Sequence, residues 1–217
     1  MLDGAHALGN IPVDLSELGD VDYALFNLHK WLFAPKSSAL LYVRRDHQLM
    51  HVPAPSVVDN LETQDFADRF VWTGTRDRTA FCAVEAAVAY RATLGGEAAV
   101  MSYNQNLALY AKRYLERAWG VTPMAPDEMM SSLSIVELPT KNATECGVIR
   151  GALITEYGLG VSGWVALPQD DIYCYLRISG QVYLEEADME RLGDAVLAIM
   201  QRLRGGGGAR RAAPEIL

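Results

Sequence analysis

The sequence predicts an α/β protein in two parts, a larger α/β part followed by a small α+β domain. Three observations lead to this prediction. Short apolar runs occur within the first 43 residues, residues 80–94 are apolar almost throughout, and beyond residue 97 apolar positions recur at helical and strand-like spacings.

The first part opens with segments typical of strands. Residues 23–26 and 39–43 are apolar runs bounded by polar residues, and residues 1–2 look like the end of a further strand. Short uninterrupted apolar runs are typical of strands covered on both faces, as in α/β sheets. We therefore expect buried strands here.

A helix is predicted over residues 80–94, ended by Gly95 and Gly96. A helix that is apolar almost all round belongs inside a larger body or at a subunit interface. The strands and this helix have too few partners in the chain to cover them. We therefore expect the chain to begin in the middle of a domain, with residues 1–96 forming the C-terminal part of a large domain.

The second part, residues 97–205, begins with a linking helix, because apolar residues recur every three or four positions over residues 97–117. Thr144 and Asp188 are expected to cap two further helices. The expected order is a strand at 133–138, a helix at 144–157, strands at 160–166 and 173–179, and a helix from 188. The glycine-rich residues 206–217 are expected to form a flexible tail.

Composition narrows the classes of partner and compartment. The formal net charge is -8 and the pI is about 5.0, which argues against nucleic acid or an anionic membrane as a partner. The three cysteines, Cys82, Cys146 and Cys174, are widely separated and form no C-x-x-C pair, so we expect neither disulfides nor a metal site. With no secretory signal at the start and no long apolar run, a cytoplasmic location is expected.

Two of the predicted strands end next to groups of complementary chemistry. Asp3 follows the first strand and Lys30 follows the next. Ligands of α/β sheets bind outside the carboxyl ends of strands, so the carboxylate and the amine are expected to face one cavity. Pyridoxal 5′-phosphate (PLP) needs this pair, because the amine forms an imine with its aldehyde and the carboxylate keeps its pyridinium nitrogen protonated. Taken singly, Asp-Gly is usually a turn and His-Lys a solvated loop; the combination favours the cofactor.

The segment DGAHALGNIPVDLSELGDVDYALFNLHKWLFAPKSSALLYVRR, residues 3–45, resembles the cofactor segment of the class V aminotransferase family, PLP-dependent enzymes of fold type I. The resemblance is strongest to the isopenicillin N epimerase-like group, which includes sulfoxide lyases of ergothioneine synthesis. It continues through WTGTRD at 72–77 and YLRIS at 175–179. One departure is Ser37, where the family commonly has glycine. The resemblance implies that the chain is the C-terminal portion of such a protein.

Roles in binding PLP are implied by the same resemblance. Asp3 would bind the pyridinium nitrogen, and His6 would lie beside the ring and reach its phenolic oxygen. His29 and Asn27 would contact the phosphate. Lys30 would form the Schiff base and move the proton at the substrate α-carbon.

Three further residues are implied to complete the site. Gly74 and Thr75 would contribute to the phosphate site of a neighbouring subunit, which implies a homodimer. Arg177 would clamp the substrate α-carboxylate, for which the planar guanidinium fork is suited. The N-terminal half of the cofactor domain, with its phosphate loop and ring-stacking aromatic residue, is not in this sequence.

Several reactions stay open for an amino acid or amino-acid derivative as substrate. C–S lyase or epimerase-like chemistry leads, and a true aminotransferase is the alternative. A cysteine desulfurase is disfavoured, because the loop at 160–169 carries no nucleophilic cysteine and Cys174 lies in an expected strand. From a different class, the chain can be a truncated non-catalytic fragment that serves as a dimerisation partner.

Overall fold

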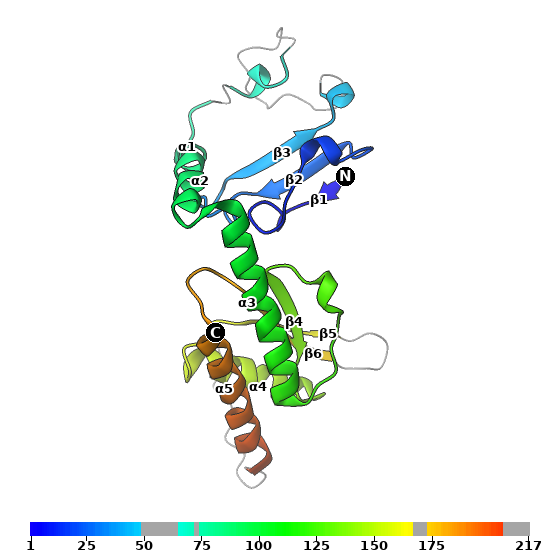
Figure 1. Cartoon of the computed structure of the whole chain (residues 1–217), viewed down its shortest axis with the longest axis vertical. Helices are drawn as coiled ribbons and strands as arrows, with labels where there is room; N and C mark the ends of the chain where they lie inside the picture. The colour runs from blue at the N-terminus through cyan, green and yellow to red at the C-terminus, as the bar shows by residue number, and fades with distance from the viewer. Residues whose placement is uncertain (49–64, 72–73, 167–172, 206–217) are drawn as a thin grey trace. The chain divides into compact units, whose positions relative to one another are not determined.

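The computed structural model describes residues 1–48, 65–71, 74–166 and 173–205 (Figure 1). The chain divides into two compact units, Met1–Met101 and Ser102–Leu217. The division falls inside the long helix α3 (Gly96–Trp119) rather than in front of it. The tail expected at 206–217 lies outside the described residues.

The first unit contains a three-stranded sheet in the order β1-β2-β3. Its strands are β1 (Leu2–Asp3), β2 (Tyr23–Asn27) and β3 (Ala39–Val43). β1 runs parallel to β2, and Asp3 lies beside Leu25. β3 runs antiparallel to β2, with Ala39 opposite Asn27. The strands expected from the apolar runs are confirmed.

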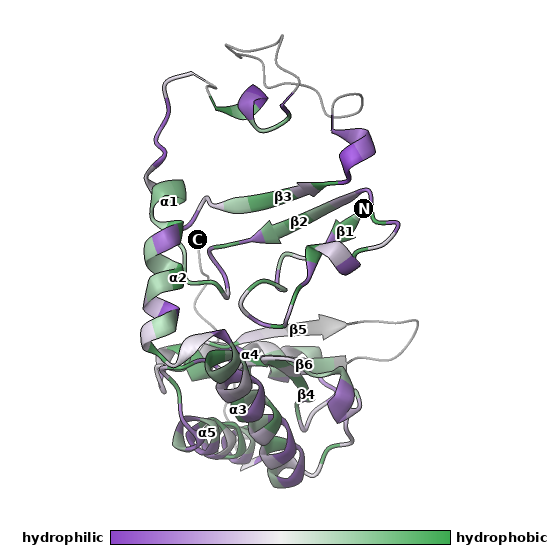
Figure 2. Cartoon of the chain, turned by 45° about the horizontal axis from the view of Figure 1, so that its top comes forward, coloured by the Kyte–Doolittle hydropathy of each residue, from purple (hydrophilic) through white to green (hydrophobic). Residues whose placement is uncertain are grey.

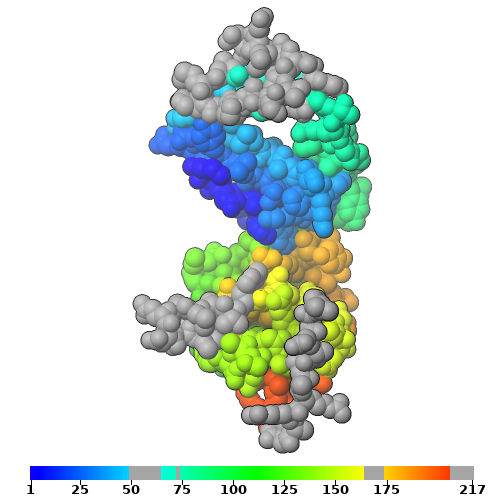
Figure 3. Space-filling model, turned by 180° about the vertical axis from the view of Figure 1, so that it is seen from behind, coloured from blue at the N-terminus to red at the C-terminus, as the bar shows by residue number. Residues whose placement is uncertain are grey.

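Burial on both faces of these strands was expected, and within the described residues this expectation is wrong. Ala24 and Phe26 are buried, but Leu25 and Leu41 are 39% and 45% exposed and face each other across the ladder. Alternate residues of a strand point to opposite faces, so one face of the sheet is covered and the other is not. Residues of this unit, blue in Figure 3, form part of the molecular surface.

The apolar segment after residue 78 forms two helices instead of the expected single one. They are α1 (Thr79–Cys82) and α2 (Val84–Thr93), separated at Ala83. Ala87 of α2 is buried and packs with Leu28 and Ala34, whereas the other sides of α2, largely pale or green in Figure 2, remain exposed. Short 3-10 turns complete the unit at Leu15–Glu17, Arg45–His47 and Asp68–Phe70.

The second unit packs helices on one face of an antiparallel sheet of order β4-β6-β5. The bounds are η4 (Asp127–Met129), β4 (Leu133–Glu137), α4 (Ala143–Thr155), β5 (Ser162–Ala166), β6 (Tyr173–Ser179) and α5 (Glu186–Gly205). Cys174, Leu176 and Ile178 of β6 enter a core shared with α3, α4 and α5. Across the described ranges, no helix combines the length and the apolar character that crossing a membrane requires.

Both helix caps expected in this unit are wrong by a few residues. Asn142, not Thr144, caps α4, since its side-chain oxygen accepts from the backbone N–H groups of Thr144 and Glu145. Asp188 lies inside the first turn of α5, where its Oδ2 accepts from the backbone N–H of Glu185. Each helix therefore begins earlier than expected, and the side chains of Asn142 and Asp188 accept from backbone N–H groups at the two helix starts.

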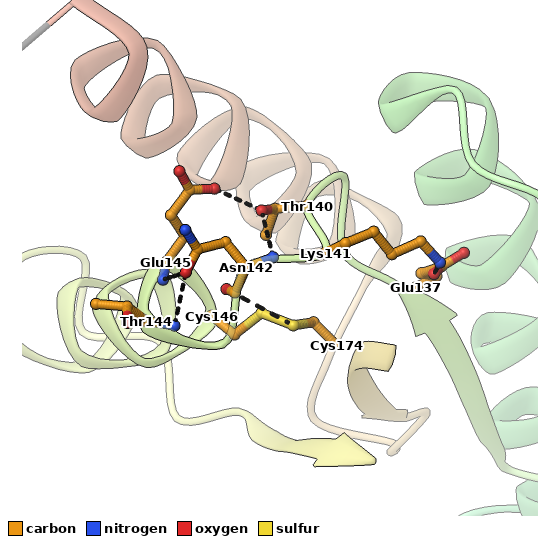
Figure 4. The surroundings of a disulfide bond; sticks show 8 residues. All are labelled: Glu137, Thr140, Lys141, Asn142, Thr144, Glu145, Cys146 and Cys174. Carbon is orange, nitrogen blue, oxygen red and sulfur yellow. Dashed lines mark hydrogen bonds and ion pairs between the residues drawn. A yellow bond between two sulfur atoms is a disulfide. The ribbon is translucent and has the colours of Figure 1, made fainter. Parts of the chain in front are cut away.

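A disulfide joins Cys146 and Cys174, contrary to the expectation of none (Figure 4). The first turns of α4 lie against the central strand β6, which brings the two Cα atoms to 6.1 Å. Their separation of 28 residues carries no sequence signal, because the contact arises only from the packing of α4 on the sheet. Cys82 is an exposed free thiol.

Candidate active site

Lys30 lies in the turn that follows β2 and is half-buried. Its Nζ lies 3.3 Å from Nε2 of His6, a residue of the loop that follows β1. The other ring nitrogen of His6, Nδ1, accepts a 3.0 Å hydrogen bond from the indole Nε1 of Trp31. The structure thus brings together two residues that are 24 positions apart and that the sequence assigned to one site.

Asp3 and Asn27 end two neighbouring parallel strands, β1 and β2. The carboxylate of Asp3 is exposed, and its Oδ1 accepts from the backbone N–H of Ala5 at 3.0 Å. Gly4 follows directly, and a Cβ atom there would lie 2.5 Å from the ring of Phe26. A glycine is therefore required for the chain to leave β1 close to β2.

His29, next to Lys30, contacts the end of the connection between β2 and β3. Its Nδ1 lies 3.1 Å from the carbonyl oxygen of Ser38, a buried residue whose hydroxyl donates to the carbonyl of Pro35. Ser37, where the family commonly has glycine, adopts a φ of 75°, and Phe33 adopts 70°. Both values lie in the left-handed region that favours glycine, so the turn is held by its surroundings and not by local preference.

Arg91 of α2 is a residue that the sequence reasoning missed. It is fully buried, and its guanidinium donates to the carbonyl oxygens of Trp31 (2.7 Å) and Gly9 (3.0 Å) and to the carboxylate of Glu97. The same group lies 4.8 Å from the ring centre of Phe33. Arg91 therefore ties together the loop that carries His6 and the turn that carries Lys30. Its one available signal was a lone arginine on the mainly apolar surface of the helix.

The remaining predicted residues lie elsewhere in the fold. Gly74 is half-buried with a φ of 86°, and Thr75 beside it is exposed. Arg177 belongs to the second unit, on β6 between Ile135 of β4 and Ser162 of β5.

Arg177 lines a cavity of about 440 Å³ in the second unit. The wall includes further polar side chains from α5 and the segment before it, Tyr183, Asp188 and Arg191. A guanidinium in a cavity of this size suits a carboxylate ligand. Trp72, part of the resembling WTGTRD segment, lies outside the described residues.

An α/β unit with a lysine and a carboxylate at the ends of neighbouring strands, followed in the chain by an α+β unit, is typical of PLP-dependent fold type I proteins. The family model described as "Aminotransferase class-V" matches residues 1–192. The chain belongs to this family, whose cofactor is PLP.

Several curated proteins are similar to the chain. An L-cysteine desulfhydrase of Arabidopsis thaliana is 31% identical, with 92% of this chain and 47% of that protein covered. A hercynylcysteine sulfoxide lyase of Schizosaccharomyces pombe is 28% identical, with 87% and 48% covered. An isopenicillin N epimerase of Streptomyces clavuligerus is 26% identical, with 92% and 52% covered. The chain thus spans about half the length of the curated relatives it matches.

The fold is also found in a solved structure. An alanine–glyoxylate aminotransferase from Nostoc sp. superposes with a TM-score of 0.69 at 18% identity, covering 91% of this chain and 52% of that one. The predicted fold class, the C-terminal part of a PLP-dependent transferase large domain followed by a small domain, is confirmed.

The residues around Lys30 fit PLP by their chemistry. The amine of Lys30 is the group that the aldehyde requires, and Asp3 offers an exposed carboxylate at the neighbouring strand end. His6 presents a ring nitrogen beside the amine. When bound, the cofactor supplies an electron sink for the bonds at the substrate α-carbon.

Proposed function

We propose that this chain carries the lysine-bearing portion of a PLP-dependent enzyme acting on an amino acid or an amino-acid derivative, with C–S lyase or epimerase-like chemistry. The observation that carries the proposal is the contact of Lys30 with His6 at 3.3 Å, beside the strand ends that hold Asp3 and Asn27. Lys30 would hold the cofactor through a Schiff base and would move the proton at the α-carbon of the substrate.

The other residues of the first unit bind and orient. Asp3 pairs with the ring nitrogen, and His6 reaches the phenolic oxygen. His29 and Asn27 donate to the phosphate, which favours imidazole and amide donors. Since Nδ1 of His29 is engaged by the carbonyl of Ser38, its Nε2 is the nitrogen left to face the phosphate, and it donates there when both ring nitrogens carry a proton.

Gly74, Thr75 and Arg177 carry further proposed roles. We propose that Gly74 and Thr75 serve the phosphate site of a second subunit in a homodimer. Arg177 clamps the α-carboxylate, since it lines the 440 Å³ cavity of the second unit.

C–S bond cleavage leads among the reactions because relatives at 31% and 28% identity are named for it, a cysteine desulfhydrase and a sulfoxide lyase. The relative named as an epimerase is 26% identical. An aminotransferase is the alternative. A truncated, non-catalytic dimerisation partner is the second candidate, and the exposed apolar side chains of α2, Val88 and Tyr90, suit a contact with another subunit.

Cofactor binding is tested by adding PLP to the purified chain. A yellow band that disappears on borohydride reduction, with the pyridoxyl group then located on Lys30 by peptide mass spectrometry, is expected. Lys30→Ala abolishes the band. Lys36→Ala is the matched control, because Lys36 is an exposed lysine in the same connection between β2 and β3 and its loss leaves the band unchanged. An unmodified Lys30 after reduction contradicts the proposal for this chain and favours the non-catalytic partner.

The reaction is tested on the loaded protein with cysteine, cysteine sulfoxides and simple amino acids. Pyruvate and ammonia released without an added acceptor are expected for a C–S lyase. Loss of optical activity without product release indicates an epimerase. A keto acid formed only when an acceptor is present indicates an aminotransferase and contradicts the leading assignment.

Homodimer formation and a cytoplasmic location are also part of the proposal. Sedimentation equilibrium of the purified chain checks the first, and a mass of one chain at all concentrations contradicts it. Cell fractionation checks the second. The disulfide between Cys146 and Cys174 weighs against a strongly reducing compartment, so the thiol content of the protein isolated under alkylating conditions is the sharper measurement.

A further inference from the structure

The imidazole of His6 lies between two groups that both normally donate hydrogen bonds. Trp31 Nε1 lies 3.0 Å from His6 Nδ1, and Lys30 Nζ lies 3.3 Å from His6 Nε2. A neutral imidazole has one nitrogen that accepts and one that donates, and an imidazolium has two donors. Both neighbours therefore cannot donate to His6 at once.

The indole settles which nitrogen carries the proton. An indole N–H donates only, so the Trp31 contact requires an unprotonated Nδ1. The contact of Trp31 is the shorter of the two by distance, and Trp31 is 4% exposed, so water does not replace it readily. The proton of neutral His6 then resides on Nε2, directed at Lys30.

The scaffold around Trp31 gives the indole little freedom to move. Its carbonyl oxygen accepts from Arg91, which is fully buried and also holds the carbonyl of Gly9. A Cβ atom at Gly9 would lie 2.6 Å from the Trp31 carbonyl oxygen, so the two loops touch at backbone level. The backbones that carry the indole and the imidazole are therefore held by the same buried cation.

We propose that Trp31 is a positioning residue that holds His6 in the Nε2–H tautomer, so that His6 donates to the Lys30 amine. An N–H donor pairs with a lone pair on its partner. The form of an amine that carries a lone pair is also the form that attacks an aldehyde. The significance for PLP rests on the proposed function. The same Nε2–H suits an acceptor on the cofactor, such as its phenolic oxygen.

His29 serves as an internal control, because its Nδ1 has a hydrogen-bond acceptor as neighbour where the Nδ1 of His6 has a donor. Its Nδ1 lies 3.1 Å from the carbonyl oxygen of Ser38, which only accepts. Nδ1 therefore carries a proton in His29 and none in His6.

The tautomers are read by NMR, because protonated and unprotonated imidazole nitrogens differ widely in ¹⁵N chemical shift. The chain has four histidines, and a His6→Gln variant identifies the His6 signals. In the chain without PLP at neutral pH, His6 is expected as Nε2–H and His29 as Nδ1–H. A His6 that is Nδ1–H or doubly protonated overturns the proposal.

Trp31→Phe removes the indole N–H and keeps an aromatic ring. The ratio of Nε2–H to Nδ1–H at His6 is expected to fall by roughly five- to tenfold, which corresponds to one ordinary hydrogen bond. Trp119→Phe is the matched control, since Trp119 is also buried (7% exposed) and its Nε1 donates to the Gly193 carbonyl of the second unit. An unchanged His6 in Trp31→Phe, or an equal change in Trp119→Phe, overturns the proposal.

A second readout uses PLP itself. The rate of Schiff-base formation, followed by the growth of its absorbance, is expected to fall in Trp31→Phe and not in Trp119→Phe. Because the NMR measurement needs no cofactor, a chain that fails to take up PLP overturns the proposed function and leaves the tautomer assignment to be decided by its own spectra.

Discussion

At the scale of single residues, Arg91 shows how strongly one buried cation shapes the candidate site. It is 0% exposed and donates to Trp31, Gly9 and Glu97. Truncating this side chain leaves the carbonyl oxygens of two buried residues without a partner, and an unpaired buried acceptor is costly. The loops with His6 and Lys30 thus depend on a residue that touches neither side chain.

We expect Arg91→Met to lower the free energy of unfolding by about 3–5 kcal/mol, because it leaves the two loop carbonyls and Glu97 unpaired. Urea titration measures the loss. Arg113→Met is the control, since this side chain is 59% exposed in its ion pair with Asp127 and such pairs contribute under about 1 kcal/mol. Equal losses in the two variants would contradict a special role for Arg91.

Tyr110 gives a pH-dependent prediction. Its hydroxyl donates to Glu190 at 2.8 Å, and this hydrogen bond, with burial and the carboxylate charge, raises the pKa of Tyr110 from 10.0 to about 12. Because the pKa of Tyr110 is raised in the folded chain, this hydrogen bond stabilises the fold fully below pH 10, and the stabilisation is lost between pH 10 and about 12.

Tyrosinate absorbance measures the ionisation, and Tyr110→Phe identifies the signal of Tyr110. In Glu190→Gln, Tyr110 should ionise at a lower pH. Glu186→Gln is the weaker control, and an equal shift in both variants would contradict the hydrogen bond as the main cause.

The predictable part of the candidate site is the set of residues adjacent in sequence to strand ends. Asp3, Asn27 and Lys30 were placed correctly on the fold because apolar runs mark where strands end. Their chemical roles remain predictions. Trp31 and Arg91 were not found as site residues because hydrogen bonds from a side chain to a distant carbonyl or ring leave no spacing in the sequence.

At the scale of elements, the end of β6 approaches helix α3 closely. A Cβ atom at Gly180 would lie 2.0 Å from the backbone oxygen of Asn104 and 2.9 Å from the backbone nitrogen of Ala108. These are backbone atoms in the middle of a 24-residue helix, so the strain is not relieved by turning a side chain. The glycine is therefore what allows β6 and α3 to pack.

Gly180→Ala is expected to destabilise the chain by about 1–3 kcal/mol through this overpacking. Gly151→Ala is the contrasting variant, because no atom lies within 4 Å of the added Cβ on helix α4. Replacing a helical glycine by alanine should stabilise by about 0.5–1 kcal/mol. Thermal unfolding of both variants decides between them, and a neutral Gly180→Ala would show that the two elements can separate at little cost.

Element positions were predicted well where periodicity governs them and less well where a single side chain does. The apolar runs gave β2 and β3, and the three–four spacing gave α3. The starts of α4 and α5 were displaced because several polar residues precede each helix and any of them can accept from its first N–H groups. The break between α1 and α2 at Ala83 has no sequence signal that we can name.

At the scale of the whole molecule, the two units differ in how completely the described chain covers them. The second unit has a large continuous core spread over α3, β4, α4, β6 and α5. In the first, one cluster consists of Leu28, Ala34 and Ala87, and Leu25 and Leu41 remain exposed on the sheet. The sequence predicted this imbalance, since its apolar runs outnumber the elements available to cover them. It did not predict the disulfide, which depends on the packing of α4 on β6.

The disulfide gives a prediction about how the two units lose structure. Closing a loop of 28 residues restricts the unfolded chain, and its reduction is expected to cost about 3–4 kcal/mol. That loss should fall on the second unit, which contains both cysteines. Hydrogen exchange should therefore accelerate over residues 133–137 and 173–179 and stay unchanged over 23–27 and 39–43.

Mass spectrometry of peptides with and without reductant measures the change in hydrogen exchange. A Cys146→Ser, Cys174→Ser double variant should show the same acceleration without reductant. Equal acceleration in both units would contradict this prediction and show that they unfold as one cooperative body.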